Sequence, residues 1–388
     1  MDNKLKLCGD YTTWSNVPFE DIVDRVSAQK KSSNLPYVEF EDIISGEGIL
    51  NKNIYERHNV KNGIYFVKGD VLFGKLRPYL KNILLANFNG IAVGDFWVLR
   101  SHRVLPYILY LVVNSNKFMR IANISSGSKM PRSDWAIVSK AMITIPESTE
   151  EQQKIASYFQ SLDSLIQTTS KELASLKQIK AASLQSMFPQ EGETVPKVRF
   201  KGFEGEWEKI PFGSFLKESY ERSTVENEDI LLSSAITGVY LNSELFGHQR
   251  GASNIGYKKI KKNMLILSAQ NLHLGNANVN LRFEHGLISP AYKVYEIVNI
   301  SPLFLQQWIK MDSTKVFFLN ATTAGASLCR KNIVWDDLYK QIVLIPSKNE
   351  QVKIGLFFSN LDKQISLQTQ RLEKLKQIKA ACLDKMFV

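Results

Sequence analysis

One segment of the chain occurs twice, and this repeat limits the possible folds more than any other feature of the sequence. Residues 151–188 and 350–387 align without a gap, half of the aligned positions are identical, and both copies contain the run LKQIKAA. An Ile-Pro step stands shortly before each copy, at 145–146 and at 345–346. A repeat spaced by about half of the chain length predicts two structural halves of one design.

The repeated segments are expected to form long helices. Neither contains proline, and the only glycine is Gly355, near the start of the second copy. A helix of this length would extend about 57 Å. Apolar side chains recur at steps of four and three residues, which is the spacing of a coiled-coil seam. The seam positions are Leu162, Ile166, Leu173 and Leu176 in the first copy, and Leu361, Ile365, Leu372 and Leu375 in the second.

A long helix with one apolar stripe needs a packing partner, and two arrangements are open. We favour an antiparallel coiled coil between the two copies, because two matching seams in one chain then account for each other. Alternatively, each stripe packs on the globular region beside it.

The regions between the repeats share a common layout. The opening Trp14-Ser-Asn-Val-Pro-Phe resembles Trp207-Glu-Lys-Ile-Pro-Phe, and after each opening short β-rich runs alternate with turn residues. This pattern predicts an α+β fold with two mixed α/β domains, two long helices and a pseudo-twofold internal repeat. The expected segments are a first domain at 1–148, a central helix at 149–188, a linker at 189–206, a second domain at 207–346 and a C-terminal helix at 347–388.

The charge balance favours an anionic partner. The 388 residues carry a formal net charge of +11, and for a basic soluble protein the first expectation is nucleic acid. The three cysteines are far apart, with no CxxC pair, so neither a disulfide framework nor a zinc cluster is indicated. The start of the chain has no signal-peptide core, and the longest apolar run, 104–113, is about half of a membrane span. We therefore expect a cytoplasmic protein with no membrane partner.

Sequence motifs of common catalytic sites are missing. There is no Pro-Pro pair for an amino-methyltransferase loop, no Pro-Asp dipeptide for a nuclease motif and no HExxH. Gly74-Lys75-Leu76 lacks the upstream glycine and the hydroxyl of a phosphate-binding P-loop. The five histidines show no metal-ligand spacing. These features favour a binding protein over an enzyme, with no cofactor and no metal in this chain.

Over essentially its whole length the sequence resembles the specificity (S, HsdS) subunit of type I restriction-modification systems. The resemblance is carried by the duplicated blocks Ile-Pro…Glu-Gln-x-x-Ile…Leu-Asp…Ile…Leu-Lys-x-x-Lys…Leu…Met-Phe at 145–188 and 345–387. The Trp…Pro-Phe openings and the linker Pro196-Lys-Val-Arg-Phe-x-Gly-Phe-x-x-x-Trp207 add to it. The duplication, with a large variable domain before each block, is the most specific part of the pattern.

The resemblance implies a fold, a function and partners. Each variable domain would be a target recognition domain that reads one half of a split site on double-stranded DNA. The two helices would pair antiparallel, set the spacing of the halves and dock two modification (methyltransferase) subunits. S-adenosylmethionine would be bound by those subunits, and ATP and Mg by a restriction subunit that can join them. Independently, two similar domains on a stiff spacer suit a reader of two half-sites.

The residues that contact DNA are a hypothesis drawn from charge and side-chain type. In the first domain Lys75, Arg77, Tyr79 and Lys81 lie in one short loop, and Arg is the side chain that most often reads guanine. A second candidate loop at 126–132 includes Lys129 and Arg132. The alternative is an ordinary solvated basic turn.

In the second domain a run of lysines is expected to bind phosphates, which position a protein without specifying sequence. A polar loop follows, whose amides can form bidentate contacts to adenine. The lysines are Lys258, Lys259, Lys261 and Lys262; the loop candidates are Gln270, Asn271, Asn278, Asn280 and Arg282, and a further loop at 322–331 adds Arg330 and Lys331. Turn-forming Asn and Ser in ordinary loops are the alternative.

The function expected from the sequence is non-catalytic DNA recognition within a restriction-modification complex. One alternative is a specificity subunit that serves a fused methyltransferase-nuclease. Another is a coiled-coil adaptor without DNA binding, which would leave two large basic domains unexplained. A third, a self-contained nucleic-acid-modifying enzyme, is disfavoured by the missing motifs.

Overall fold

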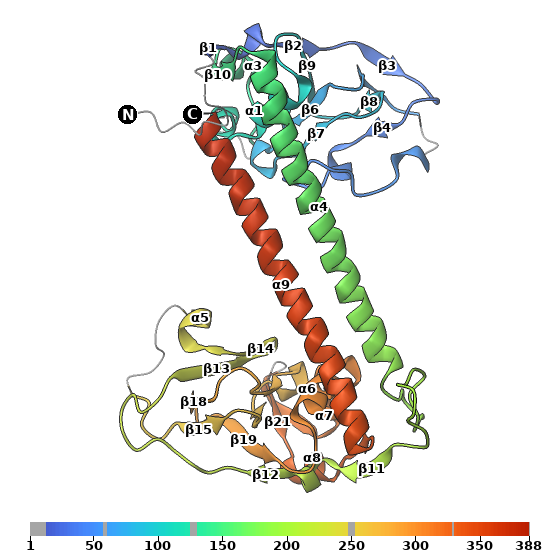
Figure 1. Cartoon of the computed structure of the whole chain (residues 1–388), viewed down its shortest axis with the longest axis vertical. Helices are drawn as coiled ribbons and strands as arrows, with labels where there is room; N and C mark the ends of the chain where they lie inside the picture. Colours follow the sequence, from blue (N-terminus) through green and yellow to red (C-terminus); the bar gives the residue numbers. More distant parts are fainter. Residues whose placement is uncertain (1–12, 57–59, 125–129, 247–252, 328–329, 388) are drawn as a thin grey trace. The chain divides into compact units, whose positions relative to one another are not determined.

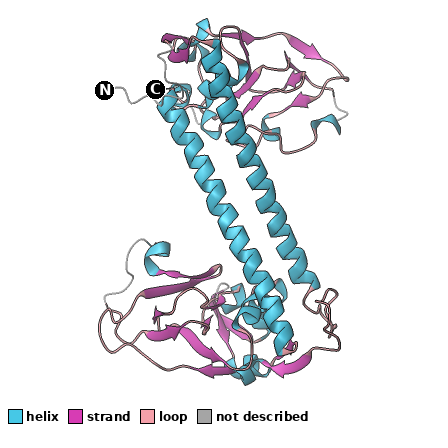
Figure 2. Ribbon diagram, in the orientation of Figure 1, coloured by secondary structure: helices cyan, strands magenta, loops and turns pink. Residues whose placement is uncertain are grey.

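The computed structural model describes residues 13–56, 60–124, 130–246, 253–327 and 330–387. The chain divides into two compact units, one formed by residues 1–170 with 370–388 and the other by residues 171–369. Each unit contains one mixed α/β domain and a segment of both long helices, α4 (Thr149–Ser186) and α9 (Lys348–Met386) (Figures 1 and 2). The compact units therefore cut across the helices instead of ending with them.

The first domain is built on two four-stranded sheets, with strand orders β2-β9-β6-β7 and β3-β5-β8-β4, and on the antiparallel pair β1-β10. Its strands are β1 (Trp14–Pro18), β2 (Val23–Val26), β3 (Gln29–Lys31), β4 (Tyr37–Val38), β5 (Asn62–Phe66), β6 (Val71–Gly74), β7 (Ile83–Leu85), β8 (Gly90–Ala92), β9 (Phe96–Ser101) and β10 (Met142–Pro146). The strands of the first sheet are rich in β-branched and aromatic residues, which favour extended backbone.

Short helices cover this framework. They are α1 (Pro106–Asn114), α2 (Asn116–Ala122), α3 (Trp135–Val138) and the 3-10 turns η1 (Phe19–Asp21), η2 (Phe40–Asp42), η3 (Ile54–Glu56) and η4 (Pro78–Leu80). Pro106 occupies the first turn of α1, where its missing N–H costs no hydrogen bond. Ser115 adopts an extended conformation that ends α1, and its hydroxyl accepts a bond from the Phe118 N–H at 3.2 Å, which starts α2.

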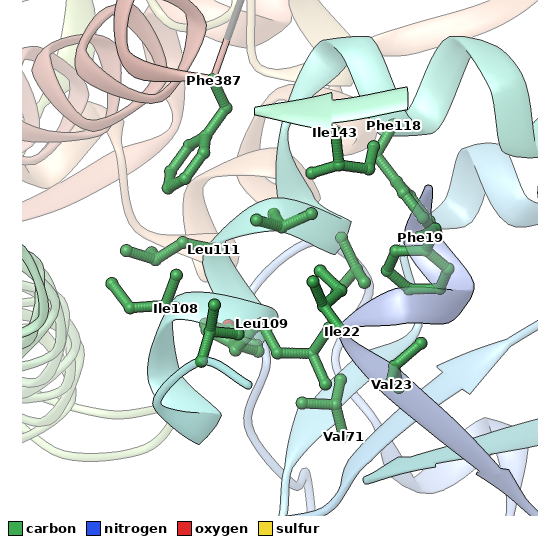
Figure 3. Close-up of a cluster of buried hydrophobic side chains, with 14 of the residues drawn as sticks. Phe19, Ile22, Val23, Val71, Ile108, Leu109, Leu111, Phe118, Ile143 and Phe387 are labelled. Atoms are coloured by element: carbon green, nitrogen blue, oxygen red, sulfur yellow. The ribbon is translucent and has the colours of Figure 1, made fainter. Parts of the chain in front are cut away.

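The core of the first domain lies between the sheet and these helices. Phe19 and Ile22 from the η1 turn, Val71 from β6 and Leu109 from α1 are fully buried. Phe387, which follows the end of α9, lies in the same cluster (Figure 3). Each large side chain buried in this way contributes about 1.5–3 kcal/mol.

The second domain contains four-stranded sheets in the orders β12-β19-β16-β17 and β14-β13-β18-β15, the pair β11-β22 and the hairpin β20-β21. Its strands are β11 (Glu208–Pro211), β12 (Leu216–Glu218), β13 (Leu231–Ala235), β14 (Gly238–Leu241), β15 (Lys258–Lys261), β16 (Leu265–Ser268), β17 (Ala277–Val279), β18 (His285–Ile288), β19 (Tyr292–Ile297), β20 (Thr322–Ser327), β21 (Arg330–Ile333) and β22 (Ile342–Ile345). Its helices are α5 (Asn242–Phe246), α6 (Pro302–Ile309), α7 (Asp312–Asn320), α8 (Trp335–Lys340), η5 (Phe212–Phe215) and η6 (Leu272–Leu274).

The two domains repeat one topology. The order β2-β9-β6-β7 corresponds to β12-β19-β16-β17, and β1-β10 corresponds to β11-β22. Among the described strands, each domain also has one parallel pair among antiparallel neighbours, β4-β8 in the first and β13-β18 in the second. The expected α+β fold with an internal repeat is therefore confirmed.

A repeated ion pair joins the long helices within each unit. In the first unit Asp163 of α4 contacts Lys379 of α9 at 2.6 Å. In the second unit Lys180 of α4 contacts Asp362 of α9 at 2.5 Å. The same two positions of the repeat are used in both units, with the helices exchanged. As residue numbers rise along α4, those of its partners fall along α9, so the expected antiparallel pairing is present.

The same aspartates also hold a short helix of each domain. The Tyr107 hydroxyl of α1 donates to Asp163 at 2.6 Å, and the Gln307 amide of α6 donates to Asp362 at 3.2 Å. A charged acceptor strengthens both bonds. Each domain is thus tied to the helix pair of its own unit.

The seam side chains are buried or half-buried along both helices. Leu162, Leu173 and Leu361 are 7–8% exposed, whereas Ile166, Leu176, Ile365, Leu372 and Leu375 are half-buried.

Among the helices in the described part of the chain, none combines the length and the apolarity that crossing a membrane requires.

At the C-terminal end of each long helix, a Met-Phe pair is buried in the core of one domain. Met187 and Phe188, after α4, are buried with Trp207 in the second domain. Met386 and Phe387, at the end of α9, are buried in the first domain, where the Phe387 ring lies 6.1 Å from the ring of Trp14. Each copy of the repeated Met-Phe pair is therefore part of the hydrophobic core of one domain.

Candidate DNA interface

The turn between β6 and β7 presents the first group of candidate residues. The Gly74 N–H donates to the Asn82 carbonyl at 2.9 Å, which closes a loop around the 3-10 turn η4. Arg77 and Lys81 flank η4, and both have left-handed backbone, with φ of 48° and 50°. Such a conformation is uncommon for residues other than glycine and marks constrained backbone. It fixes where two cationic side chains leave the turn.

Exposure differs among the side chains of this turn. Arg77 is exposed, and Tyr79 is 56% exposed although it is a large aromatic side chain. Lys81 is half-buried, its Nζ lies 3.5 Å from the Asn114 carbonyl, and burial lowers the pKa of its ammonium while Asp384 partly opposes this. Arg77 and Tyr79 are therefore the side chains of the turn that are best placed to contact a ligand.

The second domain has an equivalent turn between β16 and β17. The Ser268 N–H bonds to the Asn276 carbonyl at 3.1 Å around the 3-10 turn η6. Asn271 stands where the first domain has Arg77, and Gly275, with φ of 89°, stands where it has Lys81. The candidates Gln270 and Asn271 thus lie at the same place in the fold as the first group. They are exposed.

A second loop reaches each of these turns. In the first domain the Arg77 N–H donates to the Pro131 carbonyl at 2.8 Å, and Arg132 pairs with Leu76 as an isolated β-bridge. Arg132 and Lys75 share the carboxylate of Asp95, at 3.0 and 3.6 Å. The structure therefore brings together two loops that the sequence analysis proposed separately. Lys129 lies outside the described residues.

In the second domain the segment expected as a loop at 322–331 is part of the hairpin β20-β21, and Lys331 lies in β21. Burial lowers the pKa of His273 in η6, and the charge of Lys331 lowers it further, so the imidazole is neutral at neutral pH. The side chain of Arg330 lies outside the described residues. Lys331 thus approaches the turn of the second domain, as Arg132 does in the first.

The lysine run at 258–262 differs from the expected free basic surface. Lys258 is 6% exposed, lies 4.0 Å from Glu218, and has its pKa lowered mainly by burial. The other three face carboxylates: Lys259 faces Glu228, Lys261 faces Glu221 and Lys262 faces Glu284. The structure does not support the predicted phosphate contact at Lys258, because β15 turns this side chain inward.

The structure does not support the predicted DNA contact at Asn278 either. Asn278 is fully buried, donates to the Ser234 hydroxyl and the Ala235 carbonyl at 2.7 Å each, and accepts from Lys310 Nζ at 2.6 Å. Asn280, likewise buried, donates to the carbonyls of Lys261 and Phe283. These amides satisfy buried backbone groups.

Arg282 has a partner within the domain. Its guanidinium forms two bonds to the Glu244 carboxylate, at 2.9 and 2.7 Å, and lies over the Phe283 ring. A bidentate pair of this kind holds the guanidinium in one orientation. Arg282 is half-exposed and remains a weaker candidate than Asn271.

Sequence reasoning missed two cations on α2. Lys117 and Arg120 line a hollow of about 490 Å³ together with Ser115, Asn116, Asp384 and Phe387. In the part of the chain that the structure describes, neither cation forms an ion pair, while Asp384 accepts a bond from Asn116 at 2.8 Å. α2 packs against η4, so this hollow borders the Arg77 turn. The sequence signal that could have identified Lys117 and Arg120 is their spacing of three residues on the outer side of an apolar helix.

The comparisons with known proteins agree with this geometry. Residues 12–178 match the family described as type I restriction modification DNA specificity domain. This part of the chain is therefore similar to a type I restriction-modification DNA specificity domain. The match supports the resemblance expected from the repeated blocks and includes most of the first of them.

Solved structures share the fold over the whole length. The S subunit of the type I restriction-modification system from M. genitalium aligns with a TM-score of 0.63 and 15% identity, over 100% of this chain and 99% of that chain. A chain from a structure of complex assembly and conformational transition in the type I R-M system aligns with a TM-score of 0.53 and 17% identity, over 97% and 99%. The chain therefore shares its fold with these proteins.

Replacing Arg77 by alanine is expected to weaken binding by about 1–3 kcal/mol to DNA with the correct first half-site, because a guanidinium that reads a base loses its contact. Binding curves for duplexes with single base changes in either half would measure this. Arg103, which pairs with Glu147 at 2.8 Å in the same domain, provides the matched control R103A. Equal affinities of R77A and R103A for all duplexes would remove Arg77 from the interface.

Proposed function

We propose that the chain is the DNA-recognition subunit of a type I restriction-modification complex, with each domain reading one half of a bipartite site. The observation that carries this proposal is a repeated fold in which one turn, Gly74–Asn82 or Ser268–Asn276, presents different side chains in each copy. Because Arg77 and Asn271 occupy equivalent positions, the two halves of the site would differ in sequence. Sequence is read by contacts to base edges, which such turns can supply.

The chain would act without a catalytic step of its own and dock two modification subunits on its helices. Ile179 of α4 and Ile378 of α9 occupy the same position of the repeat, and both are exposed, at 49% and 38%. Equivalent apolar positions on two helices suit two copies of one partner. The methyl donor S-adenosylmethionine would be bound by these partners, and ATP with Mg by a restriction subunit.

Mapping of DNA methylation would test the proposal. We expect a split motif to be methylated in cells that contain the chain and its modification subunit, and to be unmethylated when the chain is deleted. A Q270A/N271A variant should alter methylation through the second half of the motif and leave the first half required. Methylation that persists unchanged without the chain would contradict the proposal.

A further inference from the structure

The turn and the neighbouring helix form one surface in each domain, which we name the turn face. In the first domain it consists of the Gly74–Asn82 turn with α2, and in the second of the Ser268–Asn276 turn with α7. α2 packs on η4 and α7 packs on η6. The two turns have equal length between equivalent strand pairs, so their residues correspond one to one.

The helices also correspond without a gap. α1 and α6 both start at a proline, Pro106 and Pro302, and the residue that caps the following helix lies at the same distance from it. Counted in this way, Lys117 corresponds to Ser313 and Arg120 corresponds to Val316.

The second turn face has an uncharged residue at each position where the first carries a cation. The first carries the cations Lys75, Arg77, Lys81, Lys117 and Arg120, whereas the equivalent positions of the second are Ala269, Asn271, Gly275, Ser313 and Val316. Asp95 offsets part of the charge of Lys75, and Asp384 lies beside the hollow.

The charged residues near the second turn face do not make up for the cations that it lacks. Asp312 and Lys315 pair with each other at 2.8 Å. His273 is neutral, and Lys310 Nζ is held by the Ile236 and Ala277 carbonyls at 2.7 and 3.0 Å. Lys331 is the cation that remains beside η6 among the described side chains.

We propose that the two domains bind DNA in different ways: the first supplies the grip on phosphates through its turn face, and the second reads bases through amide hydrogen bonds with little electrostatic attraction. Lys117 and Arg120 are assigned as phosphate contacts. The inference rests on the proposed function. Phosphate contacts release counterions and make affinity depend on salt, whereas neutral amide contacts do not. The first domain would then supply most of the salt-dependent affinity in addition to reading its own half-site, and the second would read its half-site with little such attraction.

The test measures how the affinity of the full chain for DNA depends on salt concentration. Two duplexes are compared, one of random sequence and one that carries the motif identified by methylation mapping. For K117Q/R120Q we expect the slope of log affinity against log salt to fall by about 1.8, because two phosphate contacts are lost at about 0.9 each. The loss should be the same for both duplexes. Lys68 and Lys140 are exposed cations of the same domain, and K68Q/K140Q should keep the wild-type slope.

Two variants of the second domain complete the design. Q270A/N271A should lower affinity for the motif duplex and leave its salt slope unchanged. S313K/V316R, which places cations at the equivalent positions, should raise the slope by about 1.8. A thermal unfolding midpoint equal to that of the wild type would establish that each variant is folded.

The outcomes separate this inference from the function on which it rests. If the wild-type chain neither binds DNA nor directs methylation, the proposed function fails. If the wild type binds DNA but K117Q/R120Q has the slope of K68Q/K140Q, only the inference is overturned. A fall in slope for Q270A/N271A as large as that for K117Q/R120Q would also overturn it.

Discussion

Replacing Phe387 by alanine is expected to destabilise the first unit by about 3–5 kcal/mol, because truncation of a buried phenylalanine loses its transfer free energy and leaves a cavity. Phe387 is 3% exposed and packs in the core that includes Phe19 and Leu109 (Figure 3). Such a loss is a large fraction of the stability of a typical domain. Chemical denaturation would give the magnitude, and hydrogen exchange would locate the loss.

The repeat supplies a matched variant. Phe188 stands at the same position as Phe387 but is buried in the second domain, beside Trp207 and Phe304. F387A should lower amide protection in the strands of the first domain, and F188A should lower it in the strands of the second. Loss of protection in the same domain by both variants would contradict this assignment of the two helix ends.

The architecture could be predicted from the sequence because its signals are local or repeated. The seam of 3.5-residue period predicts a helix pair without any tertiary information, and the duplicated Met-Phe and Trp…Pro-Phe segments predict a second copy of the same unit. The candidates Arg77 and Asn271 were chosen for different reasons, one for charge and the other for amide chemistry. They nevertheless lie on equivalent turns, because chain positions between equivalent strands are preserved by the repeat.

The site could be predicted only in part, because side-chain accessibility depends on partners far along the chain. Lys258 and Asn278 have side chains of the kind that contact DNA. Inside the domain, however, they contact Glu218 and Ser234, which are about 40 residues away in sequence. Conversely, Lys117 lies in a short apolar segment that resembles core. Its relation to the Arg77 turn arises only when α2 packs on η4.

A second large effect is expected at a buried ion pair of the second unit. The Arg199 guanidinium in the linker forms two bonds to the Glu350 carboxylate, at 2.6 and 2.8 Å, and Glu350 is fully buried. The hydrogen bond to Glu350 raises the pKa of Arg199, so this guanidinium stays charged. The equivalent carboxylate of the first unit, Glu151, accepts a bond from the Trp14 indole at 3.0 Å.

Replacing Arg199 by methionine should destabilise the second unit by about 3–5 kcal/mol, because it leaves a carboxylate buried without its ionic partner. Adding E350M should recover much of this loss, since an apolar pair needs no compensating charge. R103M, which breaks the half-exposed pair with Glu147, should cost at most about 1 kcal/mol. Urea denaturation of the four proteins would measure these differences.

The pH dependence of the R199M deficit distinguishes a buried charge from lost packing. An unpaired buried carboxylate favours its protonated form in the folded state, so the deficit should be largest at neutral pH. It should shrink as pH falls toward roughly 4, where glutamate also protonates in the unfolded chain. A deficit that stays constant over this range would mean that the guanidinium stabilises the linker by packing alone. Recovery by E350M together with relief in acid would establish that the linker cation compensates the buried charge of α9.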